Sequence, residues 1–178
     1  DEYAHQMRVE GSVIVSFEER KVLIKNSLKE KALSLSNQLA PIDDEGLLEE
    51  VTALVEYPNI LVGEFESKFL EVPQECLILT MKANQKYFPL VGKNQKLTNQ
   101  FLIVSNISPK NTDLIIQGNE KVIRPRLSDA EFFYAQDKKK PLKEYLVQLA
   151  NIVYHNKLGS QADRSARVKL IASLIVKT

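Results

Sequence analysis

The chain has 178 residues, of which 44% are hydrophobic and 26% charged, a composition typical of a globular protein and too apolar for a disordered one. No apolar run approaches the roughly 20 residues that a membrane-spanning helix needs. A single cysteine and two widely separated histidines exclude a disulfide framework and a cysteine-based zinc cluster. Because the first residues are polar and an initiator Met is missing, we expect a piece of a longer cytoplasmic protein.

The charge of the chain is distributed unevenly. Its net charge of +1 combines ten acidic side chains and one basic side chain in residues 41–75 with a net charge of +10 in residues 76–178. Such a basic segment is typical of a protein that binds a polyanion. The alternative is that the acidic and basic segments face each other in the fold and neutralise each other.

The first part of the chain shows helical periodicity. Apolar side chains at helical spacing predict an amphipathic helix over residues 17–37, opened by a capping box of Ser16 and Glu19. Asp44 is the predicted N-cap of a second helix that ends at residue 54 and turns Leu54 inward.

The periodicity then changes to that of strands. Short apolar runs predict strands over residues 60–65, 69–72, 87–91 and 101–104, with a turn at residues 92–94 between the last two. Pro73 is predicted to open a helix over residues 74–84, because proline is tolerated in the first turn.

Helical patterns return after Pro109. We expect helices over residues 113–124, 128–135, 142–153 and 161–176. Pro125, which lacks an amide hydrogen, is predicted to separate the first two with a kink, and Ser128-Asp129-Ala130-Glu131 is a second predicted capping box. This order of elements predicts an α+β fold class, in which a mixed helix and strand domain runs into an all-helical one.

The sequence contains no template for catalysis. Phosphate-binding loops, dinucleotide fingerprints and the nucleophile elbow of hydrolases are all missing. Cys76 lies in a core-like run and is predicted to be a buried, inert thiol. The acidic residues of 43–50 are predicted to form a solvated helix face. We therefore predict no catalytic, cofactor-binding or metal-binding residues in this chain.

Two segments carry candidate nucleic-acid contacts. In the first, Lys82, Gln85 and Lys86 can share one side of a helix end, and Tyr87 follows them. Lysines contact phosphates, and aromatic rings stack on unpaired bases. The alternative is that Tyr87 and Phe88 belong to the core of the strand while the lysines form a solvated rim.

The second segment is centred on Pro125, which Arg124 and Arg126 flank. A guanidinium group binds phosphate or carboxylate through two parallel hydrogen bonds, so both arginines are candidate contacts to a nucleic acid. The alternative for Arg126 is an internal ion pair with Asp129.

The two segments also carry a family resemblance. The matching blocks are residues 49–58, 69–73, 81–82 with 85–88, 104–107, 118–120 continuing to 126–133, and 157–160. In their order and spacing, these blocks resemble the β subunit of the heterotetrameric bacterial glycyl-tRNA synthetase.

The resemblance implies an enzyme that joins glycine to its tRNA with ATP. It implies an α2β2 assembly whose α subunit holds the adenylate-forming site, with ATP and Mg²⁺, while the β subunit contributes to recognition of tRNA(Gly). Residues 1–140 would be the later portion of a domain similar to the editing-type domain of the phenylalanyl-tRNA synthetase β chain. Residues 141–178 would begin a helical domain of HD type.

Within such an assembly, three roles are open for this chain. The favoured role is contact with tRNA(Gly) through Lys82, Gln85, Lys86, Tyr87, Arg124 and Arg126, together with organisation of the subunits. The alternatives are a purely structural scaffold that contacts the α subunit, and an editing-type aminoacyl-tRNA hydrolase. We expect the chain alone to have no ligase activity and no membrane partner.

Overall fold

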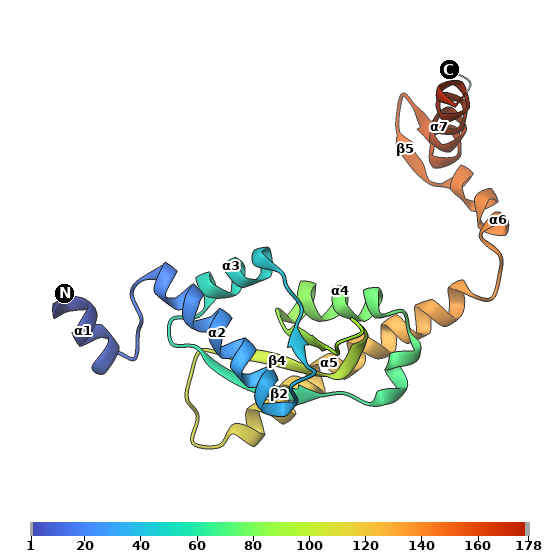
Figure 1. Cartoon of the computed structure of the whole chain (residues 1–178). Helices are drawn as coiled ribbons and strands as arrows, with labels where there is room; N and C mark the ends of the chain where they lie inside the picture. The colour runs from blue at the N-terminus through green and yellow to red at the C-terminus, as the bar shows by residue number, and fades with distance from the viewer. Residues whose placement is uncertain (1, 177–178) are drawn as a thin grey trace. The chain divides into compact units, whose positions relative to one another are not determined.

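The computed structural model describes residues 2–176 and divides the chain into two compact units, residues 1–132 and residues 133–178 (Figure 1). The helices of the first unit are α1 (Glu2–Val9), α2 (Phe17–Leu35), α3 (Glu45–Leu54), the 3-10 helix η1 (Ser67–Glu71), α4 (Gln74–Gln85) and most of α5 (Thr112–Asp137). Its strands are β1 (Ala40–Pro41), β2 (Asn59–Glu64), β3 (Phe88–Val91) and β4 (Leu97–Ser105). The predicted α+β class is therefore confirmed at this level.

The four strands form one antiparallel sheet in the order β1-β3-β4-β2. Strands β3 and β4 form a hairpin, whose predicted turn is closed by a 2.9 Å hydrogen bond from the Gly92 amide to the Lys96 carbonyl. At one edge of the sheet, β1 ends at Pro41. At the other edge, the Glu64 amide of β2 donates to Oε1 of Glu120 on α5, at 2.8 Å.

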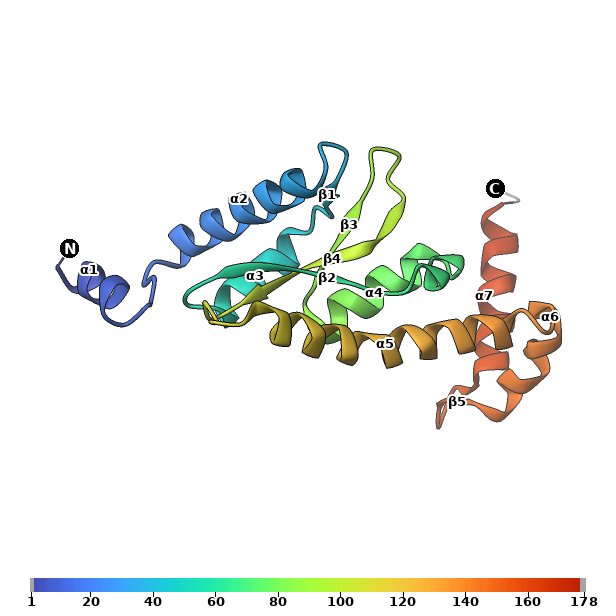
Figure 2. The ribbon, with the colours of Figure 1, turned by 90° about the horizontal axis from the view of Figure 1, so that it is seen from below.

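Each face of the sheet buries its own set of side chains, because successive residues of a strand point to opposite faces. The cluster shared with α2 and α3 contains Ile24, Leu28, Ala32, Leu47, Leu48, Val51, Val55, Ile60, Phe88, Leu90 and Leu102. Phe101 belongs to the opposite face, where its ring lies over Gly63 and stacks on Tyr87. Figure 2 shows α2 and the first part of α5 on opposite sides of the sheet.

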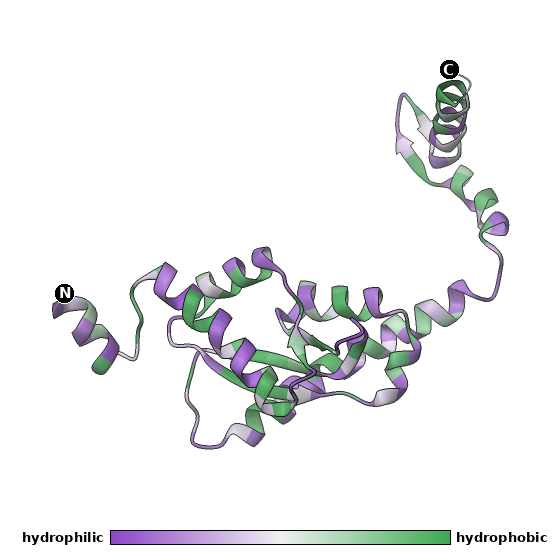
Figure 3. Cartoon of the chain, in the orientation of Figure 1, coloured by the Kyte–Doolittle hydropathy of each residue, from purple (hydrophilic) through white to green (hydrophobic). Residues whose placement is uncertain are grey.

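The helix predictions for the first unit are largely confirmed. Helix α2 buries Ile24, Leu28 and Ala32 at helical spacing, and hydrophobic and hydrophilic residues alternate along it (Figure 3). Oγ of Ser16 accepts the Glu19 amide at 3.3 Å, but the Glu19 carboxylate pairs with Arg8 at 2.6 Å, so only half of the predicted capping box forms.

The structure corrects three predictions around α3 and α4. Residues 69–72, predicted as a strand, lie in and just after the 3-10 helix η1, in which Phe69 alone turns into the core. Cys76 is exposed. Helix α4 buries Leu77 and Met81, which are one turn apart, and Cys76 lies outside the buried face that these two residues form. Leu54 is 63% exposed rather than inward.

A fourth correction concerns Pro125, which does not divide the chain into two helices. Helix α5 is continuous through it, and the proline lies between the buried side chains Ile123 and Leu127, one turn apart. Burial of these two side chains stabilises the helix on both sides of the missing hydrogen bond. Ser128 is therefore inside the helix, and the capping box predicted there is wrong.

The second unit is helical except for one short hairpin. After the end of α5 it contains α6 (Leu142–Tyr145), the 3-10 helix η2 (Leu146–Asn151), β5 (Val153–His155), β6 (Gly159–Ser160) and α7 (Gln161–Ile175). The antiparallel pair β5-β6 corrects the prediction of an all-helical region and shortens the helix predicted over 142–153. Helix α7 begins as predicted, with a capping box of Ser160 and Asp163.

No helix within residues 2–176 is long and apolar enough to cross a membrane.

Candidate nucleic-acid interface

The acidic side chains of α3 pair with lysines of α2. Nζ of Lys21 lies 2.8 Å from carboxylate oxygens of both Glu45 and Glu49, and Lys25 pairs with Glu45 at 3.1 Å. Hydrogen bonds to the two carboxylates raise the pKa of Lys21, and hydrogen bonds from Lys21 and then from Lys25 lower the pKa of Glu45. One side of the acidic segment is therefore neutralised by the N-terminal part of the chain.

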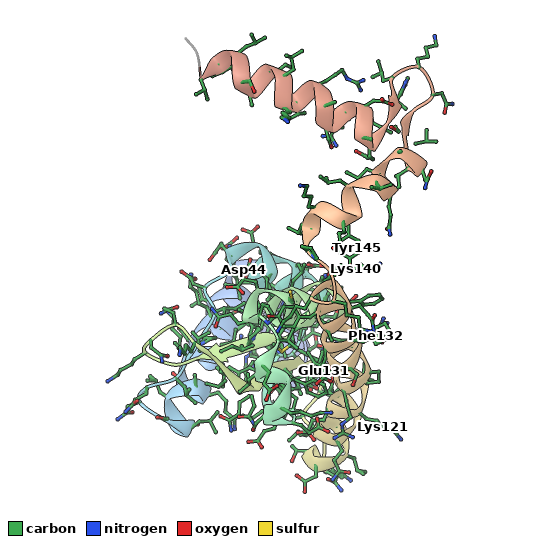
Figure 4. The ribbon with its side chains drawn as sticks, turned by 90° about the vertical axis from the view of Figure 1, so that its right-hand side faces the viewer. Asp44, Lys121, Glu131, Phe132, Lys140 and Tyr145 are labelled. Atoms are coloured by element: carbon green, nitrogen blue, oxygen red, sulfur yellow. The ribbon has the colours of Figure 1, made fainter. Side chains whose placement is uncertain are left out.

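Other acidic side chains at α3 pair with the two candidate lysines of α4. Lys82 pairs with Asp44, which lies at the start of α3 (Figure 4), and Lys86 pairs with Glu50 at 2.8 Å. The hydrogen bond from Lys82, followed by that from the Leu47 amide, lowers the pKa of Asp44. The acids of residues 43–50 are therefore mostly ion-paired, although Asp43, Glu45, Glu49 and Glu50 are exposed, as the predicted solvated face requires.

The two arginines differ in their contacts. Nε of Arg124 lies 2.7 Å from a carboxylate oxygen of Glu66, in the same acidic segment. Arg126 is exposed, and within residues 2–176 it forms no ion pair with Asp129. Among the four basic candidates, three are thus paired with acids of residues 41–75, as the neutralisation alternative predicts, and Arg126 is the one left to solvent in the described structure.

Tyr87 is a core residue. Its side chain is 3% exposed, and its ring stacks on Phe101 with 4.7 Å between the ring centroids. Its hydroxyl donates to Oδ1 of Asn119 at 2.7 Å, and burial raises the pKa of Tyr87 to about 12. Phe88 is buried as well, so the structure favours the alternative in which both rings belong to the strand core, and neither ring face is open to a nucleic-acid base.

One groove brings together three of the six candidate residues. We call it the α3–α4 groove; its volume is about 290 Å³. It is lined by Val51, Leu54, Val55, Gln85, Lys86, Tyr87, Ile103, Val104, Asn106 and Asn119. Lys82, Arg124 and Arg126 are not among its lining residues. The candidates predicted from sequence therefore do not form one continuous site.

The sequence reasoning missed two residues of this groove, Asn106 and Asn119. Oδ1 of Asn106 accepts the backbone amides of Glu56 and Tyr57, at 2.7 and 2.9 Å. Asn119 holds the Tyr87 hydroxyl and donates to the Ile115 carbonyl at 2.7 Å. Both asparagines lie in the blocks that carry the family resemblance, which is the signal that could have identified them.

A larger groove of about 490 Å³ lies between α2, β1 and the start of α3. Its apolar lining includes Leu28, Leu33 and Phe88, and charged groups surround it. Most of these charges are already satisfied, since Lys25 and Glu45 pair with each other and Asp44 pairs with Lys82. The groove therefore presents little polar capacity for holding a charged ligand.

The part of the chain that the structure describes contains no group of three or more His, Cys, Asp or Glu side chains arranged to hold a metal ion. The absence of metal and catalytic residues stays a prediction.

The sequence comparisons give the class of protein and then the family. The chain matches, over residues 1–178, the family model described as glycyl-tRNA synthetase beta subunit. It is 60% identical over 175 residues to the glycine–tRNA ligase beta subunit of Acidovorax ebreus (strain TPSY), covering 98% of this chain and 24% of that protein. The corresponding protein of Delftia acidovorans (strain DSM 14801 / SPH-1) is 58% identical over 177 residues, covering 99% of this chain and 25% of that protein.

The predicted family resemblance is confirmed. The chain belongs to the glycyl-tRNA synthetase β-subunit family. It spans about a quarter of the length of the curated relatives it matches.

Proposed function

We propose that the chain is a segment of a glycine–tRNA ligase β subunit, acting in ATP-dependent glycyl-tRNA synthesis in the cytoplasm. The observation that carries the proposal is the identity of 60% to a glycine–tRNA ligase beta subunit across 98% of the chain. The partners would be the α subunit, which would hold ATP and Mg²⁺, and tRNA(Gly), in an α2β2 assembly. The segment contributes to tRNA recognition and to subunit organisation and forms no adenylate by itself.

The proposed tRNA-facing groups are Lys82, Gln85, Lys86, Arg124 and Arg126. They project from α4 and α5 in the part of the chain that has a net charge of +10. Tyr87 supports this surface from the core instead of stacking on a base. Because three of these cations are ion-paired, tRNA phosphates compete with Asp44, Glu50 and Glu66 for them.

The proposal is tested on the complete β subunit together with its α subunit. Replacing Lys82, Lys86, Arg124 and Arg126 by Gln should weaken tRNA binding and flatten its salt dependence by roughly three units, since each phosphate contact contributes about 0.7 to 0.9. The matched control removes the same charge from the exposed lysines Lys29, Lys93, Lys96 and Lys110. Glycine-dependent ATP–pyrophosphate exchange should stay unchanged in both variants.

A second variant works in the opposite direction. Asp44→Asn with Glu50→Gln removes the carboxylates that hold Lys82 and Lys86, so both lysines become available to phosphate and tRNA binding should tighten. An unchanged salt dependence in the quadruple variant, together with unchanged affinity in this one, would exclude these residues from the tRNA interface.

The structural scaffold is the second candidate function, and the ion pairs of Lys82, Lys86 and Arg124 favour it. A scaffold role predicts that the quadruple variant lowers the melting temperature, or the yield of the assembled complex, without altering tRNA affinity at a permissive temperature.

A further inference from the structure

The floor of the α3–α4 groove is aliphatic. Val51, Leu54 and Val55 of α3 and its C-cap lie on one side, and Ile103 and Val104 of β4 lie on another. Leu54 is 63% exposed although it lines the groove, so an apolar surface remains open to solvent there. An aliphatic surface of this kind can bury one face of a planar ring, which is favourable without any polar contact.

The rim of the groove carries amide groups with unused hydrogen-bonding capacity. Among the described residues, the side-chain amide of Gln85 has no hydrogen-bond partner. Because Oδ1 of Asn106 accepts the Glu56 and Tyr57 amides, its position is fixed and its Nδ2 remains a donor. Carboxamides next to a planar ring can pair with its donor and acceptor edge, as Asn and Gln do when they read adenine.

Lys86, the cation at the rim of the groove, has an unusual backbone conformation. Lys86 caps the C-terminus of α4 with a φ of 58°, in the left-handed region that favours glycine. Its ammonium group donates to the Ala83 carbonyl at 3.2 Å and pairs with Glu50 at 2.8 Å. The sequence thus has a lysine where glycine would fit the backbone better, and the lysine places an ammonium group at the rim of the groove.

We propose that the α3–α4 groove binds a single unstacked nucleotide of tRNA. The base lies on the aliphatic floor, its edge pairs with Gln85 and Asn106, and its phosphate takes the place of Glu50 at Lys86. The volume of about 290 Å³ is enough for one nucleotide, from which the rest of the RNA strand would continue outside the groove. Sequence-specific proteins recognise RNA at such splayed-out bases, through stacking and hydrogen bonds to their edges. This inference rests on the proposed function, because it names the part of the tRNA that the segment recognises.

The first test is photo-crosslinking in the complete α and β complex. A diazirine analogue of leucine, which keeps the size of the side chain, replaces Leu54 in the groove and, as the matched control, Leu79 of α4, which is 65% exposed and does not line the groove. Irradiation with tRNA(Gly) should crosslink position 54 to one unpaired nucleotide, and position 79 weakly or not at all. A crosslink from position 54 into the α subunit, or equal RNA crosslinks from both positions, would overturn the proposal.

The second test measures tRNA affinity of the same complex. Leu54→Trp fills the groove, and Gln85→Met removes the amide while it keeps the length of the side chain. Each should weaken binding about tenfold, because the first excludes the base from the groove and the second removes a hydrogen bond to its edge. Leu79→Trp is the control for the first variant and should bind as the wild type does.

Lys86→Gly separates a binding role from a structural one. Glycine is favoured at this φ, so the variant should keep or raise the melting temperature while it weakens tRNA binding, and Lys86→Arg should restore the affinity. Unchanged affinity in all groove variants would overturn the groove as a nucleotide site, even if the wild-type complex binds and charges tRNA. Failure of the wild-type complex to bind tRNA would instead contradict the proposed function itself.

Discussion

The two units of this chain are built on different principles. Within the described residues, the first unit contains every buried side chain and every ion pair, and both faces of its sheet are covered. The described part of the second unit, residues 133–176, buries no residue and forms no ion pair, although the sequence gives residues 133–178 nine basic and three acidic side chains. The first unit is therefore stabilised by long-range packing, whereas the second is stabilised by local hydrogen bonds.

Those local interactions are few but well defined. The Gln161 amide donates to the Ile152 carbonyl at 2.8 Å, and Nη2 of Arg167 donates to the Leu158 carbonyl at 2.9 Å. The guanidinium group of Arg164 lies 4.8 Å from the ring centroid of Tyr154. With little buried apolar surface, such a unit should open locally at a much lower cost than the first.

The largest expected effect tests this contrast directly. Phe101→Ala in the 178-residue chain should lower the free energy of unfolding by about 3 to 5 kcal/mol, because it empties a fully buried position. Leu146→Ala in η2, where the side chain is 56% exposed, should cost less than about 1 kcal/mol. Urea unfolding followed by circular dichroism measures both, and comparable losses would contradict the contrast.

Two glycines of the first unit test how tightly the space around them is packed. A Cβ atom at Gly63 would lie 2.5 Å from Cζ of Phe101, so Gly63→Ala should destabilise by about 1 to 3 kcal/mol. A Cβ atom at Gly118 in α5 would meet nothing within 4 Å, so Gly118→Ala should stabilise by about 0.5 to 1 kcal/mol. Thermal unfolding of the two variants should therefore shift in opposite directions, and a stabilising Gly63→Ala would show that the Phe101 ring moves freely.

Tyr87 should make the first unit sensitive to alkaline pH. Its pKa rises from 10.0 to about 12 on folding, so its contribution is complete below about pH 10 and is lost as the pH rises through 12. Tyr87→Phe should cost about 1 kcal/mol near neutral pH, since Asn119 loses a partner. The variant should also lose part of the alkaline destabilisation, which urea midpoints measured from about pH 9 to pH 11 would detect. Parallel pH profiles for both proteins would contradict this assignment.

The smallest effect concerns the N-cap of α3. Asp44→Asn keeps a capping side chain but removes the charge that pairs with Lys82, and should cost about 0.5 kcal/mol near pH 7. Because the pKa of Asp44 is lowered from 3.8, its stabilisation is present above that value and is lost as the pH falls through the lower, folded-state pKa. The difference between the two proteins should therefore vanish in acid, as urea midpoints at decreasing pH would show. Asp44→Ala, which also removes the cap, is the larger-effect control.

The helices of the first unit were predictable because their signals are local. The stripe of Ile24, Leu28 and Ala32 and the cap at Asp44 each lie within a few residues of the structure they specify. The run around Phe69 has the composition of a strand, but it forms the 3-10 helix η1 and is not one of the strands of the sheet. Whether a partner strand is available to such a run depends on the fold. The β5-β6 hairpin carried little signal, apart from Gly159, whose φ of 85° requires glycine.

The location of the candidate side chains on their helix was predictable from the sequence, but their contacts and burial were not. Lys82 and Lys86 are on one side of α4, as their spacing indicates, but their partners Asp44 and Glu50 come from more than thirty residues earlier in the chain. Whether a lysine near an acidic segment is free or paired depends on tertiary packing. The same holds for Tyr87, because only the fold shows that its ring stacks on Phe101.

The two edges of the first unit's sheet have a consequence for synthesis of a long chain. Exposed strand edges invite pairing with other strands and hence aggregation. Here the edge strand β1 is two residues long and ends in a proline, and the Glu64 amide of β2 is occupied by Glu120 of α5. Helix α5 thus removes one pairing position from the β2 edge, and β1 is too short to offer a long one. Each of these features lowers the tendency of a newly made copy to pair with neighbouring strands.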